Sequence, residues 1–402
     1  MAQGVASVVI GANFGDEGKG LITDFETRRL GAGTVVRFNG GAQAGHTVIS
    51  RLTGQRHVFG HVGAGTFAGA NTYLSSNFIV NPMVLEKELT TLGQTPNINV
   101  HPFAKVTTIF DMALNSLVEL SRGNERHGSC GMGINETVTR HEFYPLTVGA
   151  VLQPSFTTRQ MIAAIRDEWV PNRIKALGIK DIPKAYAKIL KSNTHEVATN
   201  LFDSLQRCVI SKPAHDTLGK KPVVFEGAQG LMLDEFLGVF PHVTRSITGL
   251  PYALQAAAEI GIKRIKPIYV TRAYLTRHGA GALPNQGYDF GGQPTDPTNI
   301  DNAWQGSIRF APLEIDQLKN FIDADLLRSK FVSQVFGITV EQPTIAVTCL
   351  DQIDNLVTVV QGNKFTKMQI NELPKFLESS LGLKVSHISR GPNSGDVEYV
   401  NF

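Results

Sequence analysis

The sequence predicts an α/β fold with surrounding helices and a large, mostly parallel central sheet. Short β-branched runs recur along the chain and alternate with stretches of helical periodicity. Polar or glycine-rich motifs follow most of the runs, where loops would leave the carboxyl ends of parallel strands and chemistry gathers in such folds. The runs cover residues 7–10, 34–38, 223–225, 266–270, 344–349 and 356–360, and helical stretches include 82–92, 110–120 and 313–327.

The composition is that of an ordinary globular protein of 402 residues, with 42% hydrophobic and 18% charged residues. A net charge of +3 is too small to indicate a nucleic-acid partner. No secretory signal and no run of roughly 20 apolar residues is evident, so we expect no membrane partner and a cytoplasmic location. We expect one catalytic domain over residues 1–402, with a helical insertion at 157–205.

The first strand, at residues 7–10, leads into the glycine-rich loop GDEGKG at 15–20 and then into a helix at 21–29. A buried strand, such a loop and a helix together expose backbone N–H groups to phosphate. No Ser or Thr follows Lys19, so this is not a Walker A sequence. Lys19 can still reach a phosphate as a point charge, and Asp16 can bind Mg²⁺ or take a proton. The alternative is a turn with solvated charges, and the strand-and-helix context favours phosphate.

The second strand, at residues 34–38, is followed by the segment NGGAQAGHT, which carries His46 between Gly45 and Thr47. An imidazole titrates near neutral pH and suits general acid catalysis. A lone histidine is more often structural, but a glycine-rich position after a strand favours a site.

Three later segments are individually less specific. The loop GSCGMG at 128–133 offers hydroxyl and backbone groups to a phosphate. FEGAQG at 225–230 follows a strand, and its Gln229 has the donor and acceptor that suit the edge of a purine base, although a polar turn is the alternative. Asp351 ends a late strand and either reads a guanine N–H edge or caps a helix.

Taken together, these segments resemble adenylosuccinate synthetase, and they run in family order across nearly the whole chain. The resemblance implies a P-loop-related fold, a homodimer and a C–N ligase. In the family reaction a nucleoside triphosphate phosphorylates O6 of a 6-oxopurine nucleoside monophosphate, and the amine of L-aspartate then displaces that phosphate at C6. The motifs are GDEGKG at 15–20, GGAQAGHT at 40–47, GSCGMG at 128–133, FEGAQG at 225–230, FPHVT at 240–244, TRAYLTRHGAGALP at 271–284, LD at 350–351 and GP at 391–392.

The resemblance also implies roles for individual residues. Asp16 would remove the purine N1 proton and bind Mg²⁺ together with the carbonyl of Gly45, His46 would support phosphoryl transfer, and Lys19 would hold the triphosphate. Further contacts to the donor, GTP or ATP, would come from Gly15, Glu17, Gly18, Gly20, Thr47, Asp351, Ser389, Gly391 and Pro392. The acceptor nucleotide would contact Asp16, Gln43, Ser129, Cys130, Gln229, Thr244 and Arg140, the last of which we expect to reach a neighbouring subunit's phosphate site.

This sequence departs from the cellular enzymes where they bind aspartate. Their arginine-rich loop corresponds to residues 298–310, which contain only Arg309 as an arginine. Met132 replaces an arginine in the third glycine loop, Cys130 replaces a threonine, and Cys349 replaces a lysine that helps to recognise guanine. We therefore expect aspartate to be held by Thr298, Asn299, Gln305 and Arg309.

These departures resemble the bacteriophage branch of the family, which makes 2-amino-deoxyadenylosuccinate from dGMP. If the protein is viral, we expect it in the host cytoplasm. We therefore expect dGMP as the acceptor, with IMP as the alternative. The phage enzymes carry a smaller residue at the position of Asp16, but an ionised Asp16 can accept a hydrogen bond from the guanine 2-amino group. A non-catalytic nucleotide-binding homologue is the second alternative, and the retention of Asp16, Lys19 and His46 argues against it.

Overall fold

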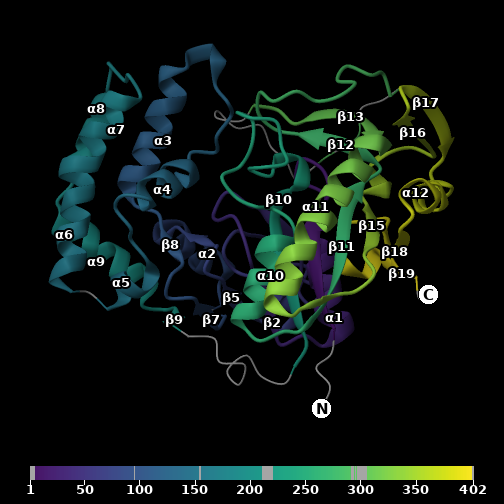
Figure 1. The fold of residues 1–402 in the computed structure, drawn as a ribbon, viewed down its shortest axis with the longest axis horizontal. Coiled ribbons are helices and arrows are strands. Elements are labelled where there is room, and N and C mark those ends of the chain that lie inside the picture. Colours follow the sequence, from purple (N-terminus) through teal and green to yellow (C-terminus); the bar gives the residue numbers. More distant parts are fainter. Residues whose placement is uncertain are drawn as a thin grey trace.

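The computed structural model describes residues 5–94, 96–153, 155–210, 221–290, 294, 296 and 306–400. Its centre is an 11-stranded sheet in which all neighbouring strands are parallel except the last pair, β18 and β19 (Figure 1). The predicted α/β class with a mostly parallel sheet is confirmed. The strand order is β19 (Val397–Tyr399), β18 (Lys384–Ser389), β15 (Thr344–Thr348), β11 (Arg264–Arg272), β1 (Ala6–Gly11), β10 (Val223–Gly230), β2 (Thr34–Arg37), β5 (Asn71–Leu74), β7 (Ile98–Val100) and β9 (Val209–Ile210), and β14 (Thr339–Val340) pairs with β11.

Helices cover both faces of this sheet because successive side chains of a strand point to opposite faces. Val8 and Ile10 of β1 belong to a core with α10 (Leu250–Glu259), α11 (Ile315–Phe336) and α12 (Leu373–Leu381). Val9, between them, packs with Leu21 and Ile22 of α1 (Lys19–Leu30). β1 is therefore buried on both sides, and the loop that follows it lies at the carboxyl edge of the sheet.

Three smaller sheets complete the strand pairing. The strand predicted at 356–360 lies in one of them, outside the central sheet. The strand predicted at 223–225 continues to Gly230, because Glu226 still pairs in register with Val9 of β1 and Arg37 of β2. The small sheets are β12 (Tyr274–Arg277), β13 (Arg309–Glu314), β16 (Leu356–Gln361) and β17 (Lys364–Gln369); β3 (His46–Ile49) and β4 (Arg56–Phe59); and β6 (Ile79–Val80) and β8 (Lys105–Val106).

The helices α3 to α9 lie together at one end of the molecule (Figure 1). Within residues 156–205, Ile162, Leu190 and Leu201 share a core with Leu114 and Leu117 of α3, so this segment packs on neighbouring helices. Its status as an insertion within a single domain stays a prediction. The bounds are α2 (Pro82–Leu92), α3 (Ile109–Ser121), α4 (Ile134–His141), α5 (Val148–Leu152), α6 (Phe156–Ala164), the π-helix η3 (Ile165–Trp169), α7 (Val170–Ala176), α8 (Lys184–Leu190) and α9 (Thr194–Leu205), with 3₁₀ turns η1 (Ala64–Ala68), η2 (Gly123–Glu125), η4 (Leu231–Leu233), η5 (Leu350–Gln352) and η6 (Ser394–Asp396).

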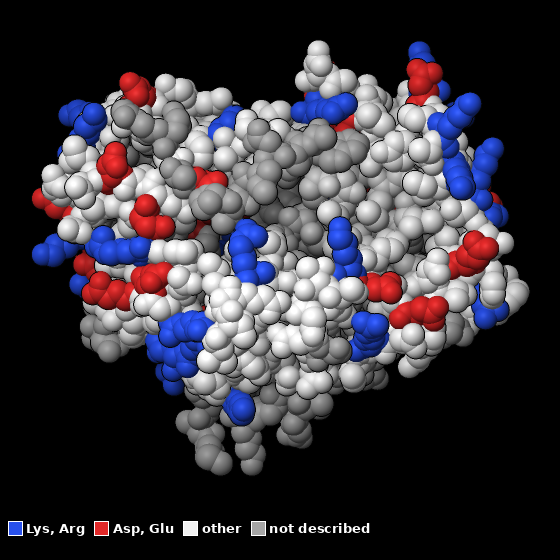
Figure 2. Space-filling view, turned by 180° about the vertical axis from the view of Figure 1, so that it is seen from behind, with Lys and Arg blue, Asp and Glu red and all other residues white. Residues whose placement is uncertain are grey.

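Charges of both signs are spread over the surface. On the face shown in Figure 2, the described Lys and Arg side chains are interspersed with Asp and Glu and form no continuous basic patch. Among the described residues, no helix has the length and apolarity that crossing a membrane requires.

A buried carboxylate ties three elements of the main core together. Asp325 of α11 accepts a hydrogen bond from the Tyr269 hydroxyl of β11 at 2.9 Å and from the Leu250 backbone N–H at the start of α10 at 3.1 Å. Its third partner is the Arg328 guanidinium, at 2.9 Å. Asp325 therefore positions both helices on the strand that lies beside β1.

Replacing Asp325 by Ala leaves the Tyr269 hydroxyl and the Leu250 N–H without this acceptor in the core, whereas Arg328 keeps its pair with Asp234 at 2.7 Å. We expect Asp325→Ala to lower the free energy of unfolding by about 3 kcal/mol, as for other broken buried ion pairs. Asp323→Ala is the matched control, because Asp323 lies on the same helix with its side chain 56% exposed and pairs only with Lys319. The control should change stability by less than about 1 kcal/mol. Equal losses in urea unfolding of the two variants would contradict this role.

Candidate functional site

The glycine-rich loop between β1 and α1 is organised by Glu17. Its buried carboxylate accepts hydrogen bonds from the backbone N–H groups of Asn13 (3.1 Å) and Gly15 (2.8 Å), and it pairs with the Lys19 ammonium at 2.6 Å. The ideal Cβ of an alanine at Gly230 would lie 2.2 Å from the Asn13 carbonyl oxygen, so the end of β10 must be glycine. In the free protein, the Glu17 carboxylate thus holds the loop and its lysine in place.

Asp16 lies on the outer side of this loop, in the left-handed region with φ of 60°. Its side chain is 31% exposed, and one carboxylate oxygen lies 3.5 Å from Nε2 of His278. The Arg272 guanidinium donates to the Asp16 carbonyl at 2.5 Å and pairs with Asp296 at 2.9 Å. Asp16 therefore presents its carboxylate toward solvent on a backbone that Arg272 holds.

His46 begins β3 and packs against the start of α1. The ideal Cβ at Gly20 would lie 2.8 Å from Cβ of His46, so only glycine admits the imidazole this close to Lys19. Nδ1 of His46 lies 2.5 Å from the carboxylate of Glu226, whose other oxygen accepts from the Ala64 backbone N–H and lies 3.8 Å from Arg37.

The ionisation of this pair follows from its burial. Burial lowers the pKa of His46, and Glu226 opposes that effect only in part. Burial also works against ionisation of Glu226, but Arg37 and His46 outweigh it and lower the pKa of Glu226. The pair is therefore a neutral imidazole that donates from Nδ1 to a carboxylate, with Nε2 as the remaining ring nitrogen for chemistry.

Two amide side chains are predicted to contact the acceptor nucleotide, and the Gln43 amide lies beside Gly40 in the segment after β2. Gln229 at the end of β10 lies against Gly15, because an ideal Cβ there would be 3.8 Å from its side-chain oxygen. Both polar atoms of the Gln43 amide are buried without a hydrogen-bond partner in the structure. Burying an amide without partners costs free energy, so Gln43 is poised for a ligand that supplies them.

The third glycine loop connects to Asp16 through the segment after β12. An ideal Cβ at Gly279, the residue after His278, would lie 2.8 Å from the carbonyl of His127 and 3.8 Å from Gly128. Ser129 follows, and its hydroxyl donates to Asn115 at 3.0 Å. Cys130 is half-buried, and burial raises the pKa of its thiol, so it is not a reactive thiolate here.

Arg140 lies elsewhere. It is fully buried and binds Asp111 through Nε (2.9 Å) and Nη2 (3.1 Å), and it donates to the carbonyls of Tyr144 and Val106 at 2.7 Å. This arrangement disagrees with the prediction that Arg140 reaches a neighbouring subunit, because its guanidinium is engaged inside its own chain. Thr244 is half-buried and forms a backbone hydrogen bond with Leu233 at 2.8 Å.

The residues predicted for the donor base leave the adjacent parallel strands β15 and β18 at the same edge. Thr348, the last residue of β15, donates from its hydroxyl to the Glu17 carbonyl at 2.6 Å, which joins this edge to the phosphate loop. Asp351 is exposed, as is Pro392, while Ser389 and Gly391 are buried and joined by a 2.8 Å hydrogen bond.

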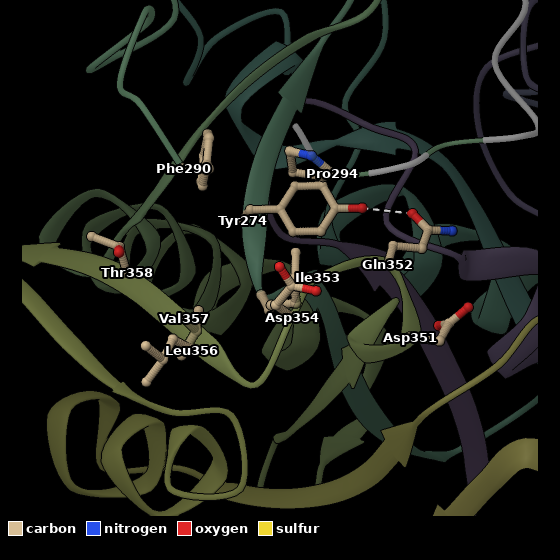
Figure 3. A pocket seen from close by; sticks show the side chains of 11 residues that line it. Tyr274, Phe290, Pro294, Asp351, Gln352, Ile353, Asp354, Leu356, Val357 and Thr358 are labelled. Atoms are coloured by element: carbon tan, nitrogen blue, oxygen red, sulfur yellow. Dashed lines mark hydrogen bonds between the residues drawn. The ribbon is translucent and has the colours of Figure 1, made fainter. Parts of the chain in front are cut away.

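A cavity of about 200 Å³ lies beside Asp351. Figure 3 shows Tyr274 pointing its hydroxyl at Gln352, a hydrogen bond of 2.6 Å, with Asp351 on the far side of Gln352 from Phe290. The lining thus combines an aromatic wall with exposed carboxylates, a composition typical of a site for a polar heterocycle.

Three of the four predicted aspartate-binding residues, Thr298, Asn299 and Gln305, lie outside the described residues. Arg309 of β13 is half-buried, and it donates to the carbonyls of Gly279 and Gly281 at 2.5 and 2.6 Å. Gly279 directly follows His278, which contacts Asp16, so Arg309 binds the segment next to that contact.

The candidate metal ligands are hard oxygen atoms, the carboxylate of Asp16 and the exposed backbone of Gly45. Among the described residues, no group of three or more His, Cys, Asp or Glu side chains could hold a metal ion. One carboxylate with few other protein ligands suits Mg²⁺, which is usually completed by water and substrate phosphates. The residues present fit such an ion.

Sequence reasoning missed the residues that hold the predicted ones. Glu226 and Arg272 each lie on a strand of the central sheet, and their partners are distant in the chain. A carboxylate within an otherwise apolar strand, FEGAQG, was the available signal for Glu226. Arg272 and His278 lie within the motif at 271–284, but nothing local marked their contacts to Asp16.

Comparison with known proteins bears on the family of this chain. The adenylosuccinate synthetase family model matches residues 8–295. The adenylosuccinate synthetase of Trichormus variabilis is 30% identical over 303 residues, which are 69% of this chain and 62% of that protein. The chain thus spans less than two thirds of this relative's length.

Two solved structures share the fold. The fully ligated adenylosuccinate synthetase of Plasmodium falciparum aligns with a TM-score of 0.75 at 18% identity, over 99% of this chain and all of that chain. The succinoaminodeoxyadenylate synthetase of cyanophage S-2L, bound to dGMP and to dATP as an energy donor, aligns with a TM-score of 0.62 at 16% identity, over 100% and 97%. By its family-model match over most of its length, the chain belongs to the adenylosuccinate synthetase family.

Proposed function

We propose that this protein is a C–N ligase that joins L-aspartate to C6 of a purine nucleoside monophosphate, using a triphosphate to activate O6. The observation that carries the proposal is that Asp16 and Lys19 share one loop and that His46 packs against Gly20, where this loop enters α1. A carboxylate, an ammonium and an imidazole there supply a base, a phosphate ligand and a proton-bearing group for phosphoryl transfer. Membership of the family supports the same reaction.

The proposed chemistry assigns one task to each of these groups. The Asp16 carboxylate takes the N1 proton, which leaves electron density on O6 to attack the γ-phosphorus. Lys19, held ready by Glu17, passes to the donor phosphates when they bind. The negative charge of the triphosphate favours protonation of His46, whose Nε2 then donates to the transferring phosphoryl group while Glu226 retains the Nδ1 proton.

Mg²⁺ would be held by Asp16, the Gly45 carbonyl and the donor phosphates. When bound, it neutralises charge that builds up on the phosphoryl oxygens. The chain's own contribution is to position those oxygens through the loop from Gly15 to Gly20.

We propose dGMP as the acceptor. Guanine presents two donors on one edge, N1–H and the 2-amino group, and these match the two oxygens of the exposed Asp16 carboxylate. Hypoxanthine presents only N1–H there. The cyanophage neighbour, solved with dGMP, and the absence of the family's arginine at Met132 support the same acceptor.

The donor is proposed to be GTP or ATP, with its base toward Asp351, Ser389, Gly391 and Pro392. A homodimer is proposed as the assembly, because the loop after η4 exposes Phe236, Val239 and Phe240, the last to 84%. Light scattering tests the assembly, and a monomeric mass would refute it.

Turnover tests the reaction and its acceptor together. The protein is incubated with aspartate, Mg²⁺ and GTP, ATP or dATP, and phosphate release is measured with dGMP, GMP or IMP as acceptor. We expect release with dGMP. Release with IMP alone would refute the dGMP assignment, and no release with any acceptor would refute catalysis. Asp16→Ala and His46→Ala should each abolish release without lowering the melting temperature by more than a few degrees.

Glu226→Gln should lower kcat by roughly 10–100-fold, because the amide cannot stabilise the imidazolium that forms at His46. The substituted amide oxygen still accepts from the Ala64 N–H, and a thermal melt checks that the loss of charge beside Arg37 leaves the protein folded. Glu341→Gln is the control, since Glu341 lies on the surface after β14 and pairs with Arg264. An unchanged kcat in Glu226→Gln would contradict the role of the pair.

Gln43→Met should weaken acceptor binding by about tenfold while leaving the melting temperature unchanged or higher. The amide has no partner in the free protein, so its removal costs the unliganded fold nothing, whereas the complex loses hydrogen bonds. Titration of dGMP by calorimetry measures the binding. A lower melting temperature with unaltered dGMP affinity would show that Gln43 is structural.

A further inference from the structure

Two arginines occupy directly opposite positions on neighbouring strands of the small sheet beside the site. Arg277 of β12 and Arg309 of β13 are direct partners in an antiparallel pair. Like charges placed directly opposite each other on neighbouring strands destabilise a sheet. Such an arrangement needs a compensating group.

No carboxylate among the described residues serves these arginines in this way. Arg277 donates to the carbonyls of Ala282 (2.7 Å) and His242 (3.0 Å), and Arg309 donates to the carbonyls of Gly279 and Gly281 and to the side-chain oxygen of Gln286. All of these acceptors are uncharged. Within the described part of the chain, neither guanidinium forms an ion pair with a carboxylate.

Buried donors point to a ligand that completes the site. The side chain of Arg277 is 5% exposed, yet its Nε has no hydrogen-bond partner, and neither has Nδ1 of His242. The guanidinium of Arg277 stacks on the ring of Phe14, with Cζ 4.2 Å from the ring centre. Burial and then the charge of Arg309 lower the pKa of Arg277 to about 10, and burial, Arg277 and Arg309 lower the pKa of His242.

This cluster adjoins the catalytic loop on one side and the third glycine loop on the other. His278, the residue after Arg277, contacts Asp16, and Phe14 belongs to the phosphate loop itself. The ring of His127, just before the third glycine loop, lies 5.1 Å from the ring of His242. An anion bound here would be part of a substrate of the same reaction.

We propose that Arg277, Arg309 and His242 form an anion subsite that binds a carboxylate or phosphate group of a substrate. The inference rests on the proposed function for the identity of that substrate: aspartate offers two carboxylates, and the acceptor nucleotide offers its 5′-phosphate. A guanidinium fork matches the oxygens of either group. The cellular enzymes of the family carry arginines at the position of Met132 and in the loop that corresponds to residues 298–310. This chain has no arginine at 132 or in 298–308, and the subsite would supply positive charge in their place.

Binding and kinetics of matched variants test the subsite. Arg277→Gln and Arg309→Gln each remove one charge, and Arg264→Gln is the control, because Arg264 lies on the surface at the opposite end of β11. For each protein, the rise in melting temperature is measured with inorganic phosphate and with succinate as probes. The Kd of dGMP without aspartate and the KM of aspartate are measured as well.

We expect the wild type and Arg264→Gln to be stabilised by at least one probe, and this rise to be lost in Arg277→Gln and Arg309→Gln. If the succinate effect is lost and the KM of aspartate rises by about tenfold or more, the subsite takes a carboxylate. If the phosphate effect is lost and the Kd of dGMP rises by a similar factor, it takes the 5′-phosphate.

A purely structural role gives a different result. If the two arginines only brace the loop carbonyls, the variants melt earlier but keep the full rise with both probes, and their Kd and KM are unchanged. That outcome, or a wild type that neither probe stabilises, would overturn the subsite. If the wild type shows no turnover but is stabilised by a probe, and both variants lose that stabilisation, the subsite is supported and the proposed reaction is refuted.

Discussion

The buried carboxylate of Glu17 is the constraint on which the site depends. A single side chain satisfies two backbone N–H groups of the loop and the ammonium of Lys19, so it fixes the turn that presents Asp16. It also pairs with the Lys19 side chain in the interior, where an unpaired ammonium would be strongly disfavoured. Because the Lys19 ammonium is already paired with this carboxylate, the free protein carries little uncompensated charge at this point.

Parallel pairing explains why residues distant in the chain meet here. β1, β2, β10, β11 and β15 all end at one edge, so the loops after them converge without any long excursion of the backbone. Glycine at position 20 then lets His46 approach α1, and glycine at position 230 lets the Asn13 carbonyl approach β10, more closely than a residue with a Cβ would allow. The arrangement of Asp16, His46 and Gln229 is thus a consequence of strand order combined with small residues at the contacts.

The sequence was informative where chemistry and local structure coincide. The motif at 15–20, the strand at 34–38 and the helix at 82–92 are set by glycine, β-branched runs and a capping asparagine, and all are local signals. The partner of His46 lies 180 residues further along the chain, and the facing of Arg277 by Arg309 depends on the register between two strands, which local patterns do not reveal. The buried state of Arg140 likewise depends on Asp111, 29 residues earlier, and spacing alone does not reveal such a contact.

Arg272 links two segments of the site that are distant in the sequence. Its guanidinium holds the Asp16 carbonyl with one nitrogen and Asp296 with another, so the glycine-rich loop after β1 and Asp296 share one link. By thermodynamic reciprocity, two ligands that each favour this arrangement of the link would raise each other's affinity by the same factor.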